Sequence, residues 1–324
     1  MTKSFLVLIF SLSFFSFSQQ IFRKEFKLMG CEFSVSVVSN DSMQASSSIN
    51  LAFIEMKRIE ALISSWDKNS QTSLVNKNAG IKPVKVNEEL FNLIERSLVL
   101  SKLTDGAFDI SYASMDKIWR FDGSMKTFPT TEKIKKSISK VGHKNIILDK
   151  KNSTVLLKFK GMKIGFGAIG KGYAADKAKD LLEKNGVKSG IINASGDMYC
   201  WGTKPNGKEW KIAITNPFDK NKNFATLPIK NQAVVTSGNY EKFITFNKKR
   251  YAHIINPKTG YPSTGIINVT VFAPKAEFAD ALATSVFVLG REVGINRINQ
   301  LPNVECIIID EKGTVFTSDN IKIN

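Results

Sequence analysis

A glycine-rich segment in the middle of the chain, Gly165 to Gly172, has the spacing of a turn that can hold a phosphate. It contains the pattern G-x-G-x-x-G, lies at the end of an expected strand at 163–167 and precedes an expected helix at 173–185. Glycines let backbone N–H groups approach a phosphate, and the positive end of the helix dipole adds attraction. A dinucleotide-binding fold would need an acidic residue about 20 positions on, whereas Asp197 comes 27 residues after Gly170. The segment is also compatible with a tight turn that binds nothing.

A carboxylate and a hydroxyl share one face of a second expected helix, at 278–289. Asp280 and Thr284 are spaced i and i+4, so both side chains lie on the same side near the start of that helix. Carboxylate and hydroxyl oxygens are hard ligands that suit Mg²⁺ better than zinc. The alternative is an ordinary helix start with an aspartate in its first turn.

His253 is one of only two histidines, and it stands where an expected strand enters a turn rich in Pro and Gly, Tyr251 to Gly260. Histidine is the side chain best suited to move protons near neutral pH. A structural role is the alternative for His253. The other histidine, His143, has no comparable setting and we expect it to be structural.

Two further segments can line a binding site. Residues 104–111 hold Asp109 in a loop after an expected helix, and residues 235–240 are an expected strand end and turn. The first is compatible with a loop that presents Asp109 and its backbone to a planar ligand, or with a plain helix end followed by core residues. Alone, neither segment decides between binding and structure.

Taken together and in order, these segments resemble the ApbE family of FAD:protein FMN transferases. The resemblance runs over nearly the whole chain after its N-terminus, through segments at 29–30, 65–66, 106–109, 167–173, 236–238, 253–260 and 279–284. It implies an α+β, T-fold-like architecture of antiparallel sheets covered by helices, with FAD held in a cleft. Several separated motifs in the right order make the resemblance far more specific than the glycine turn alone.

The resemblance also implies roles for individual residues. His253 matches the family's catalytic histidine. The residues that match its FAD-binding positions are Met29, Trp66, Ala107, Phe108, Asp109 and Lys171. The Ala168 carbonyl, Asp280 and Thr284 match its Mg²⁺ ligands. The chain departs from the family pattern at Gly165, where aspartate is usual, at Ser195, where glycine is usual, and at Asn256, where aspartate is common. We therefore expect nucleotide contacts to differ in detail while the metal pair and His253 are kept.

The implied reaction moves the FMN part of FAD to a threonine of another protein and releases AMP, with Mg²⁺ as cofactor and FAD as substrate. The implied partners are exported or membrane-anchored flavoprotein subunits, and peripheral contact with a membrane is left open. Three rivals are an FAD pyrophosphatase that forms FMN and AMP, a protein that binds FAD without reaction, and an oxidoreductase built on the glycine turn. The missing acidic partner and the leader at the N-terminus both argue against the oxidoreductase.

The N-terminus reads as a secretory signal peptide at 1–18, followed by one flavin transferase domain at 19–324. Lys3 precedes an apolar stretch from Phe5 to Phe17 that is too short to span a bilayer comfortably. The expected location is the periplasm or the outer face of the inner membrane. Three well-separated cysteines suggest neither a disulfide framework nor a metal site.

The net charge is strongly positive, +17, but the lysines are scattered and no nucleic-acid module is recognisable. We therefore expect no nucleic-acid partner.

Hydrophobic periodicity predicts a mixed order of helices and strands without regular alternation, which indicates an α+β fold. Besides the elements named above, we expect a strand at 26–38, a helix at 42–64, a polar loop at 65–80 and a helix at 87–104. A lysine-rich helix and two strands are expected within 130–160. Further strands are expected at 190–193, 210–215, 233–237, 242–246, 251–255, 267–272 and 305–310, with a last helix at 291–299.

Overall fold

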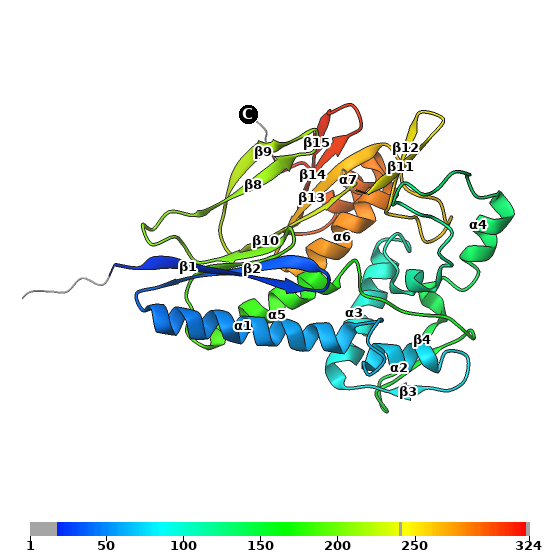
Figure 1. Cartoon of the computed structure of the whole chain (residues 1–324), viewed down its shortest axis with the longest axis horizontal. Helices are drawn as coiled ribbons and strands as arrows, with labels where there is room; N and C mark the ends of the chain where they lie inside the picture. Colours follow the sequence, from blue (N-terminus) through cyan, green and yellow to red (C-terminus); the bar gives the residue numbers. More distant parts are fainter. Residues whose placement is uncertain (1–17, 240–241, 322–324) are drawn as a thin grey trace, which may run out of the picture.

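An eight-stranded sheet, antiparallel between all neighbours, forms the centre of the computed structural model, which describes residues 18–239 and 242–321 (Figure 1). Its strands, in spatial order, are β1 (Gln20–Leu28), β2 (Cys31–Ser39), β6 (Gly190–Ala194), β7 (Asp197–Trp201), β10 (Gln232–Gly238), β13 (Ile266–Ala273), β14 (Glu305–Asp310) and β15 (Val315–Thr317). Alternate side chains of each strand face opposite sides, so the sheet can bury apolar residues on both.

Helices cover one face of this sheet. α1 (Ser42–Ile63), α5 (Gly170–Lys184) and α6 (Ala276–Leu289) pack against β2, β6, β10 and β13, and α7 (Arg291–Asn299) packs beside α6 (Figure 1). α1 begins where Asp41 caps the N–H groups of Met43 and Gln44, and its apolar residues at helical spacing face the core. The main hydrophobic core lies between these helices and the sheet.

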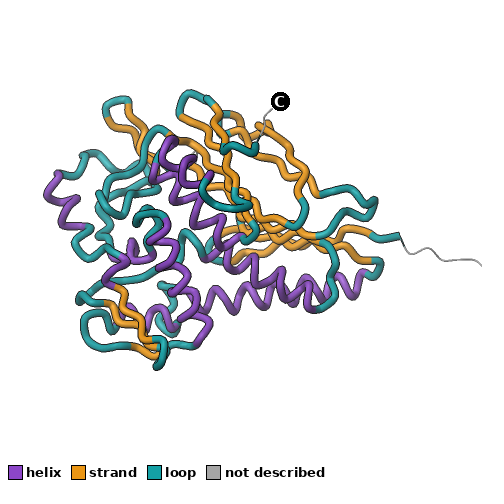
Figure 2. The backbone as a smooth tube through the Cα atoms, turned by 180° about the vertical axis from the view of Figure 1, so that it is seen from behind, coloured by secondary structure: helices purple, strands orange, loops and turns teal. Residues whose placement is uncertain are grey.

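A hairpin of two long strands covers the other face. β8 (Trp210–Asn216) and β9 (Asp219–Ile229) pair with each other, and Trp210 and Ile212 pack on Val234 and Phe272 of the sheet. Val234 belongs to this second core, whereas its neighbour Val235 belongs to the first. Neighbouring residues of β10 therefore pack on opposite faces of the sheet, one in each core. Figure 2 shows the sheet and the elements that cover it from behind.

A smaller lobe sits against the helical side. Within the described residues it contains the three-stranded sheet β3–β5–β4 and five helical segments, and the hairpin of β11 and β12 lies above it in the view of Figure 1. The bounds are α2 (Gln71–Lys77), β3 (Val84–Lys85), α3 (Glu88–Leu103), η1 (Ile110–Ser114), α4 (Thr131–Ser137), η2 (His143–Asn145), β4 (Ile146–Asp149), β5 (Thr154–Leu157), β11 (Phe243–Phe246) and β12 (Lys249–Ala252).

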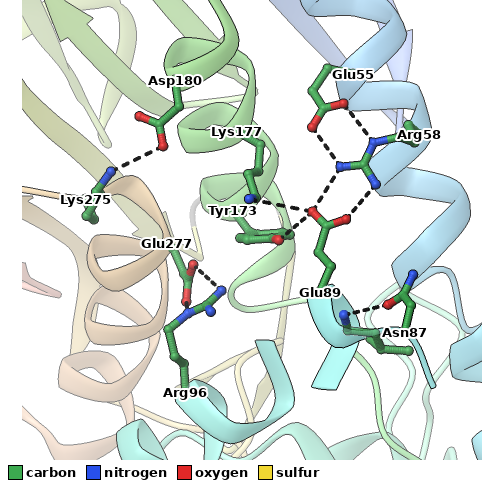
Figure 3. A network of polar contacts seen from close by, with 11 residues as sticks. Glu55, Arg58, Asn87, Glu89, Arg96, Tyr173, Lys177, Asp180, Lys275 and Glu277 are labelled. Atoms are coloured by element: carbon green, nitrogen blue, oxygen red, sulfur yellow. Dashed lines mark hydrogen bonds and ion pairs between the residues drawn. The ribbon is translucent and has the colours of Figure 1, made fainter. Parts of the chain in front are cut away.

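Charged side chains tie α1, α3, α5 and α6 together (Figure 3). Arg58 of α1 donates to Glu89 of α3, which also accepts a hydrogen bond from the Tyr173 hydroxyl of α5 at 2.8 Å. Arg96 of α3 donates to Glu277 of α6 at 2.6 Å. This network fixes the two helices that carry most of the polar residues of interest, α5 and α6.

The α+β prediction is confirmed, with antiparallel sheets and covering helices. Three local predictions are wrong. The strand expected at 26–38 is a hairpin, because Met29 and Gly30 take positive φ values of 50° and 72° and reverse the chain. The strand expected at 163–167 is irregular, held by bonds such as Gly165 N–H to the Ile110 carbonyl. The loop expected at 65–80 contains α2, which Ser70 caps.

The predicted signal peptide, 1–18, lies outside the described residues except for Ser18. Among the helices of the described residues, none combines the length and the apolar character needed to span a bilayer.

Candidate active site

A cleft of about 1060 Å³ opens between the smaller lobe and the sheet, where segments far apart in the sequence meet. Nine of the ten predicted site residues line it: Trp66, Ala107, Phe108, Asp109, Ala168, Lys171, His253, Asp280 and Thr284. Met29 does not; it lies in the β1–β2 turn, where its N–H donates to the Glu60 carboxylate. The fold thus gathers in one cleft the glycine turn, the helix with Asp280 and Thr284, and the strand end with His253.

The glycine turn places α5 directly against α6. Gly172 lies so close to α6 that an added Cβ would stand 2.1 Å from the Ala276 carbonyl oxygen. Its N–H donates to the Asp280 carboxylate at 3.3 Å, and Asp176, one turn further along α5, accepts from the N–H groups of Ala276 and Glu277 at 2.9 Å each. Asp176 thereby satisfies N–H groups at the start of α6, whose own N-cap residue does not. Only glycine permits this approach, which sets Asp280 beside the turn.

Lys171 and Asp280 line the floor of the cleft, and a second buried carboxylate, Asp197, supports that floor from the protein side by its contact with Lys171. Lys171 Nζ lies 2.9 Å from the Asp197 carboxylate, and Asp197 and Asp280 are 1% and 3% exposed. Within the described residues, neither Asp197 oxygen accepts a hydrogen bond of good geometry. Of the described side chains, Lys171 alone therefore balances the charge of Asp197. With both carboxylates ionised, one negative charge is left without a cation.

The pKa values at this floor reflect that imbalance. Burial raises the pKa of Asp280 well above its usual value, and the charge of Asp197 raises it further. Burial lowers the pKa of Lys171, but Asp197 and Asp280 outweigh this effect and the net pKa is raised, so the ammonium stays charged. Buried carboxylates of this kind are stabilised in their charged form by a bound cation.

Hydroxyl groups extend the floor toward β10. Thr284 Oγ1 lies 3.4 Å from Ser237 Oγ, and Ser237 and Thr236 at the end of β10 also line the cleft. The site therefore offers carboxylate, hydroxyl and carbonyl oxygens, which are hard ligands. In the described chain, three or more His, Cys, Asp or Glu side chains do not cluster in any metal-binding arrangement. The donor set suits a cation such as Mg²⁺, which keeps part of its water or substrate shell.

His253 lies across the cleft in a defined tautomer. Its ring Nδ1 is 3.1 Å from the Lys242 carbonyl oxygen, which can only accept, so we assign the proton to Nδ1. Burial lowers the pKa of His253 below its ordinary value. The ring is therefore neutral at neutral pH and its Nε2 lone pair is free to accept a proton.

Asp109 holds the loop that forms one wall. Its carboxylate accepts hydrogen bonds from the N–H and hydroxyl groups of Ser111 and from the His143 N–H at 2.7 Å. These bonds fix the loop after α3. His143 has a structural role here, because its N–H donates to Asp109 and its Nδ1 lies 3.5 Å from the same carboxylate. Asp109 lines the cleft, but both of its carboxylate oxygens already accept hydrogen bonds from the protein.

Trp66 stands at the mouth of the cleft. Its side chain is 80% exposed, with the Lys117 ammonium 4.7 Å from the ring centroid. Gly165, where the family pattern has aspartate, also lines the cleft, and a Cβ there would meet the Ala113 Cβ at 3.1 Å. The tight packing against Ala113 gives a physical reason for glycine at this position.

Asp197 and Ser237 are site residues that sequence reasoning did not assign. Ser237 was within a segment of interest, 235–240, but without a defined role. Asp197 follows a turn in which Ser195 has a positive φ of 55°. A carboxylate directly after such a turn, at the start of an apolar strand, was the available signal.

Comparison with known proteins identifies the family of this chain. The family model described as "ApbE family" matches residues 29–308. An FAD:protein FMN transferase of Klebsiella pneumoniae (strain 342) is 31% identical over 293 residues, covering 90% of each chain. A crystal structure of the ApbE protein of Thermotoga maritima superposes with a TM-score of 0.82 at 31% identity, covering 93% of this chain and 97% of that one. The flavinyl transferase ApbE of Pseudomonas stutzeri, at 23% identity and a TM-score of 0.82, shares the fold. This chain belongs to the ApbE family.

Proposed function

We propose that this protein is an FAD:protein FMN transferase, which moves the FMN part of FAD to a threonine of an acceptor protein and releases AMP. The observation that carries the proposal is the convergence in one cleft of Lys171, Asp280, Thr284 and His253, from three separate segments. Relatives that carry the name FAD:protein FMN transferase align with most of the chain. The cleft supplies a cationic group, hard oxygen ligands and a neutral imidazole, as the reaction requires.

Mg²⁺ fits the residues that are present. Asp280, Thr284 and the Ala168 carbonyl would hold it, since all three line the cleft and Lys171 is already paired with Asp197, so that an ionised Asp280 lacks a cation of its own. Bound there, the ion would supply positive charge that stabilises the negative charge of a pyrophosphate during its cleavage. Catalysis of phosphoryl transfer rests chiefly on positioning and electrostatic stabilisation, so few reactive side chains are needed.

The residues of the chain orient and deprotonate the reactants. Lys171, held by Asp197, places a fixed positive charge at the floor, where the phosphates lie. His253 Nε2 accepts the proton of the acceptor threonine as its Oγ attacks the FMN-side phosphorus. The bond from that phosphorus to the AMP oxygen breaks, and AMP leaves with the electron pair. Because Nδ1–H is held by the Lys242 carbonyl, the ring keeps Nε2 as its acceptor.

The location and partners follow from the N-terminus. A signal peptide at 1–18 would deliver the domain at 19–324 to the periplasm, so the acceptors are exported or membrane-anchored flavoprotein subunits. Removal of the N-terminal segment in cells, detected as a shorter mature protein in the periplasmic fraction, tests this step.

The test uses purified protein with FAD and MgCl₂, with and without an acceptor protein, followed by mass analysis. We expect an FMN added to one acceptor threonine, AMP in equal amount, and loss of both with Asp280→Ala. Asp319→Ala, an exposed carboxylate far from the cleft in sequence, is the matched control and should react normally. Release of free FMN with no labelled acceptor would identify a pyrophosphatase, and FAD binding without AMP would identify a flavin-binding protein.

A further inference from the structure

The three-stranded sheet β3–β5–β4 has one buried face and one exposed face. Its register pairs Val84 with Val155 and Ile146 with Leu157, all buried. Ile147 pairs with Leu156 on the opposite, exposed side. The small sheet lies at the margin of the molecule, away from the eight-stranded sheet (Figures 1 and 2).

Lysines surround apolar side chains on this surface, which we call the small-sheet face. By register, Lys85, Ile147 and Leu156 lie on the outer face of the sheet. Residues of the adjoining turns, all exposed, complete this surface: Ile81, Lys82, Lys150, Lys151, Lys158, Phe159 and Lys160. All six lysines are exposed, and within the described residues only Lys150 forms an ion pair, with Glu95 at 3.3 Å. The acidic residue within these strands, Asp149, lies on the same outer side and offsets one of these charges. The face therefore has a positive charge that the protein does not neutralise.

The apolar members are exposed to an unusual extent for their type. Ile81, Ile147 and Phe159 are 66%, 49% and 38% exposed. Large apolar side chains that gather on one surface, rather than standing singly, indicate a binding surface. Lysines around them add long-range attraction for a negative partner.

The kind of cation indicates the partner. Residues 126–163 contain eleven lysines, two acidic residues and no arginine, and so carry +9 of the chain's +17. Protein–protein interfaces favour arginine, whose planar fork pairs with carboxylates, and they contain few lysines. Lysines beside exposed aliphatic and aromatic side chains are typical of surfaces that bind anionic lipid.

We propose that the small-sheet face docks the protein on an anionic lipid bilayer. Lysine ammonium groups contact lipid phosphates, while Ile81, Ile147 and Phe159 enter the interface between headgroups and acyl chains. None of the residues of this face lines the cleft, so a docked molecule keeps its active site open. The cleft is nevertheless close in sequence, since Lys163 and Ile164, which line it, follow β5 within a few residues. The proposal does not depend on the reaction that the cleft performs.

The test is sedimentation of the protein without its signal peptide, residues 19–324, with vesicles of 30% phosphatidylglycerol and 70% phosphatidylcholine (values of the order commonly needed for electrostatic binding). One variant combines Lys82→Gln, Lys85→Gln, Lys158→Gln and Lys160→Gln. The matched control combines Lys184→Gln, Lys188→Gln, Lys208→Gln and Lys211→Gln, which removes the same charge from exposed positions elsewhere. A third variant, Ile81→Ser with Ile147→Ser, removes apolar contact and keeps the charge.

We expect the first variant to bind vesicles about tenfold or more weakly than the unmodified protein, and the control to stay within about twofold. The third variant should also bind more weakly, and its remaining binding should be more sensitive to salt. Equal losses in the two lysine variants would overturn the proposal, because binding would then reflect net charge alone. The proposal would also be overturned if the unmodified protein did not sediment with the vesicles while the first variant lost affinity for an acidic acceptor protein. The surface would then bind protein, not lipid. A normal FAD reaction in each variant verifies that it is folded.

Discussion

Replacing Gly172 with alanine tests whether the contact between α5 and α6 sets the active-site geometry. The added Cβ would lie 2.1 Å from the Ala276 carbonyl oxygen and 2.8 Å from the Glu277 nitrogen, and contacts under 3.0 Å are not tolerated. The two helices must therefore separate by about 1 Å at this point, a typical overpacking strain that costs about 1–3 kcal/mol of stability. The hydrogen bond from the Gly172 N–H to Asp280 would lengthen with them.

The same displacement should reduce catalysis more than stability. A misplacement of about 1 Å in a catalytic group costs roughly 100-fold in rate, and α6 carries both Asp280 and Thr284. We expect Gly172→Ala to lower the rate of FMN transfer by about that factor while the purified protein remains folded. The assay measures initial rates of acceptor flavinylation at saturating FAD, together with the urea midpoint of unfolding.

Leu182→Ala provides the control for Gly172→Ala. Leu182 is fully buried on the same helix, but three turns further from the cleft, and its truncation should cost about 2–5 kcal/mol. We expect Leu182→Ala to lose stability and retain the transfer rate at a temperature where it is folded. If Gly172→Ala transferred FMN at the normal rate, or if both variants lost rate in proportion to stability, the close approach of α5 and α6 would not be what positions the metal-binding pair.

Three other results are expected. The transfer rate should fall as the pH drops through a value below 6.5, because the lowered pKa of His253 keeps the base neutral above it, and His253→Gln should abolish this limb of the pH profile. Tyr173→Phe should cost about 1.5 kcal/mol in urea unfolding through the lost bond to Glu89, with the transfer rate unchanged (Figure 3). Arg58 lowers the pKa of Glu89, so the stability that Glu89 contributes is present above its unfolded pKa of 4.5 and is lost as the pH falls through its folded pKa. Arg58→Met should reduce this acid-induced loss, measured as the difference between the free energies of unfolding at pH 7 and pH 3.

Helix positions could be predicted well because their signal is local. α1 and α3 lie within one residue of their expected bounds, since capping residues and apolar periodicity both mark them. The segment at 163–167 was predicted as a strand on its composition, yet its hydrogen bonds run to η1 and to side chains instead. The partners of a short apolar segment are set by tertiary contacts, and a single sequence does not show them.

The site shows the same division. Asp280 and Thr284 could be paired from their helical spacing, and the fold places them in one cleft with Ala168 and His253. That the Asp109 carboxylate is largely taken up by the N–H groups of Ser111 and His143 could not be predicted, because the bond to His143 joins residues 34 positions apart. Met29 lies in the β1–β2 turn outside the cleft lining, so its predicted contact with FAD stays a prediction.

Asp197 decides how strongly the cleft floor should attract a cation, because it is the second buried carboxylate. Its charge balances Lys171, and without it the ammonium would face Asp280 alone and compete with any divalent ion for that carboxylate. At about 4 Å and an effective dielectric constant of 20, one unit charge contributes roughly 4 kcal/mol to an interaction, so even partial screening leaves more than tenfold in affinity. We therefore expect Asp197→Asn to raise the Mg²⁺ concentration for half-maximal transfer at least tenfold, with kcat largely recovered at high Mg²⁺. Calorimetric titration of Mg²⁺ into the protein without acceptor should show the same shift. If Mg²⁺ bound as tightly to Asp197→Asn as to the unmodified protein, Lys171 would not be a competitor for Asp280, and the excess negative charge of the floor would not be what recruits the ion.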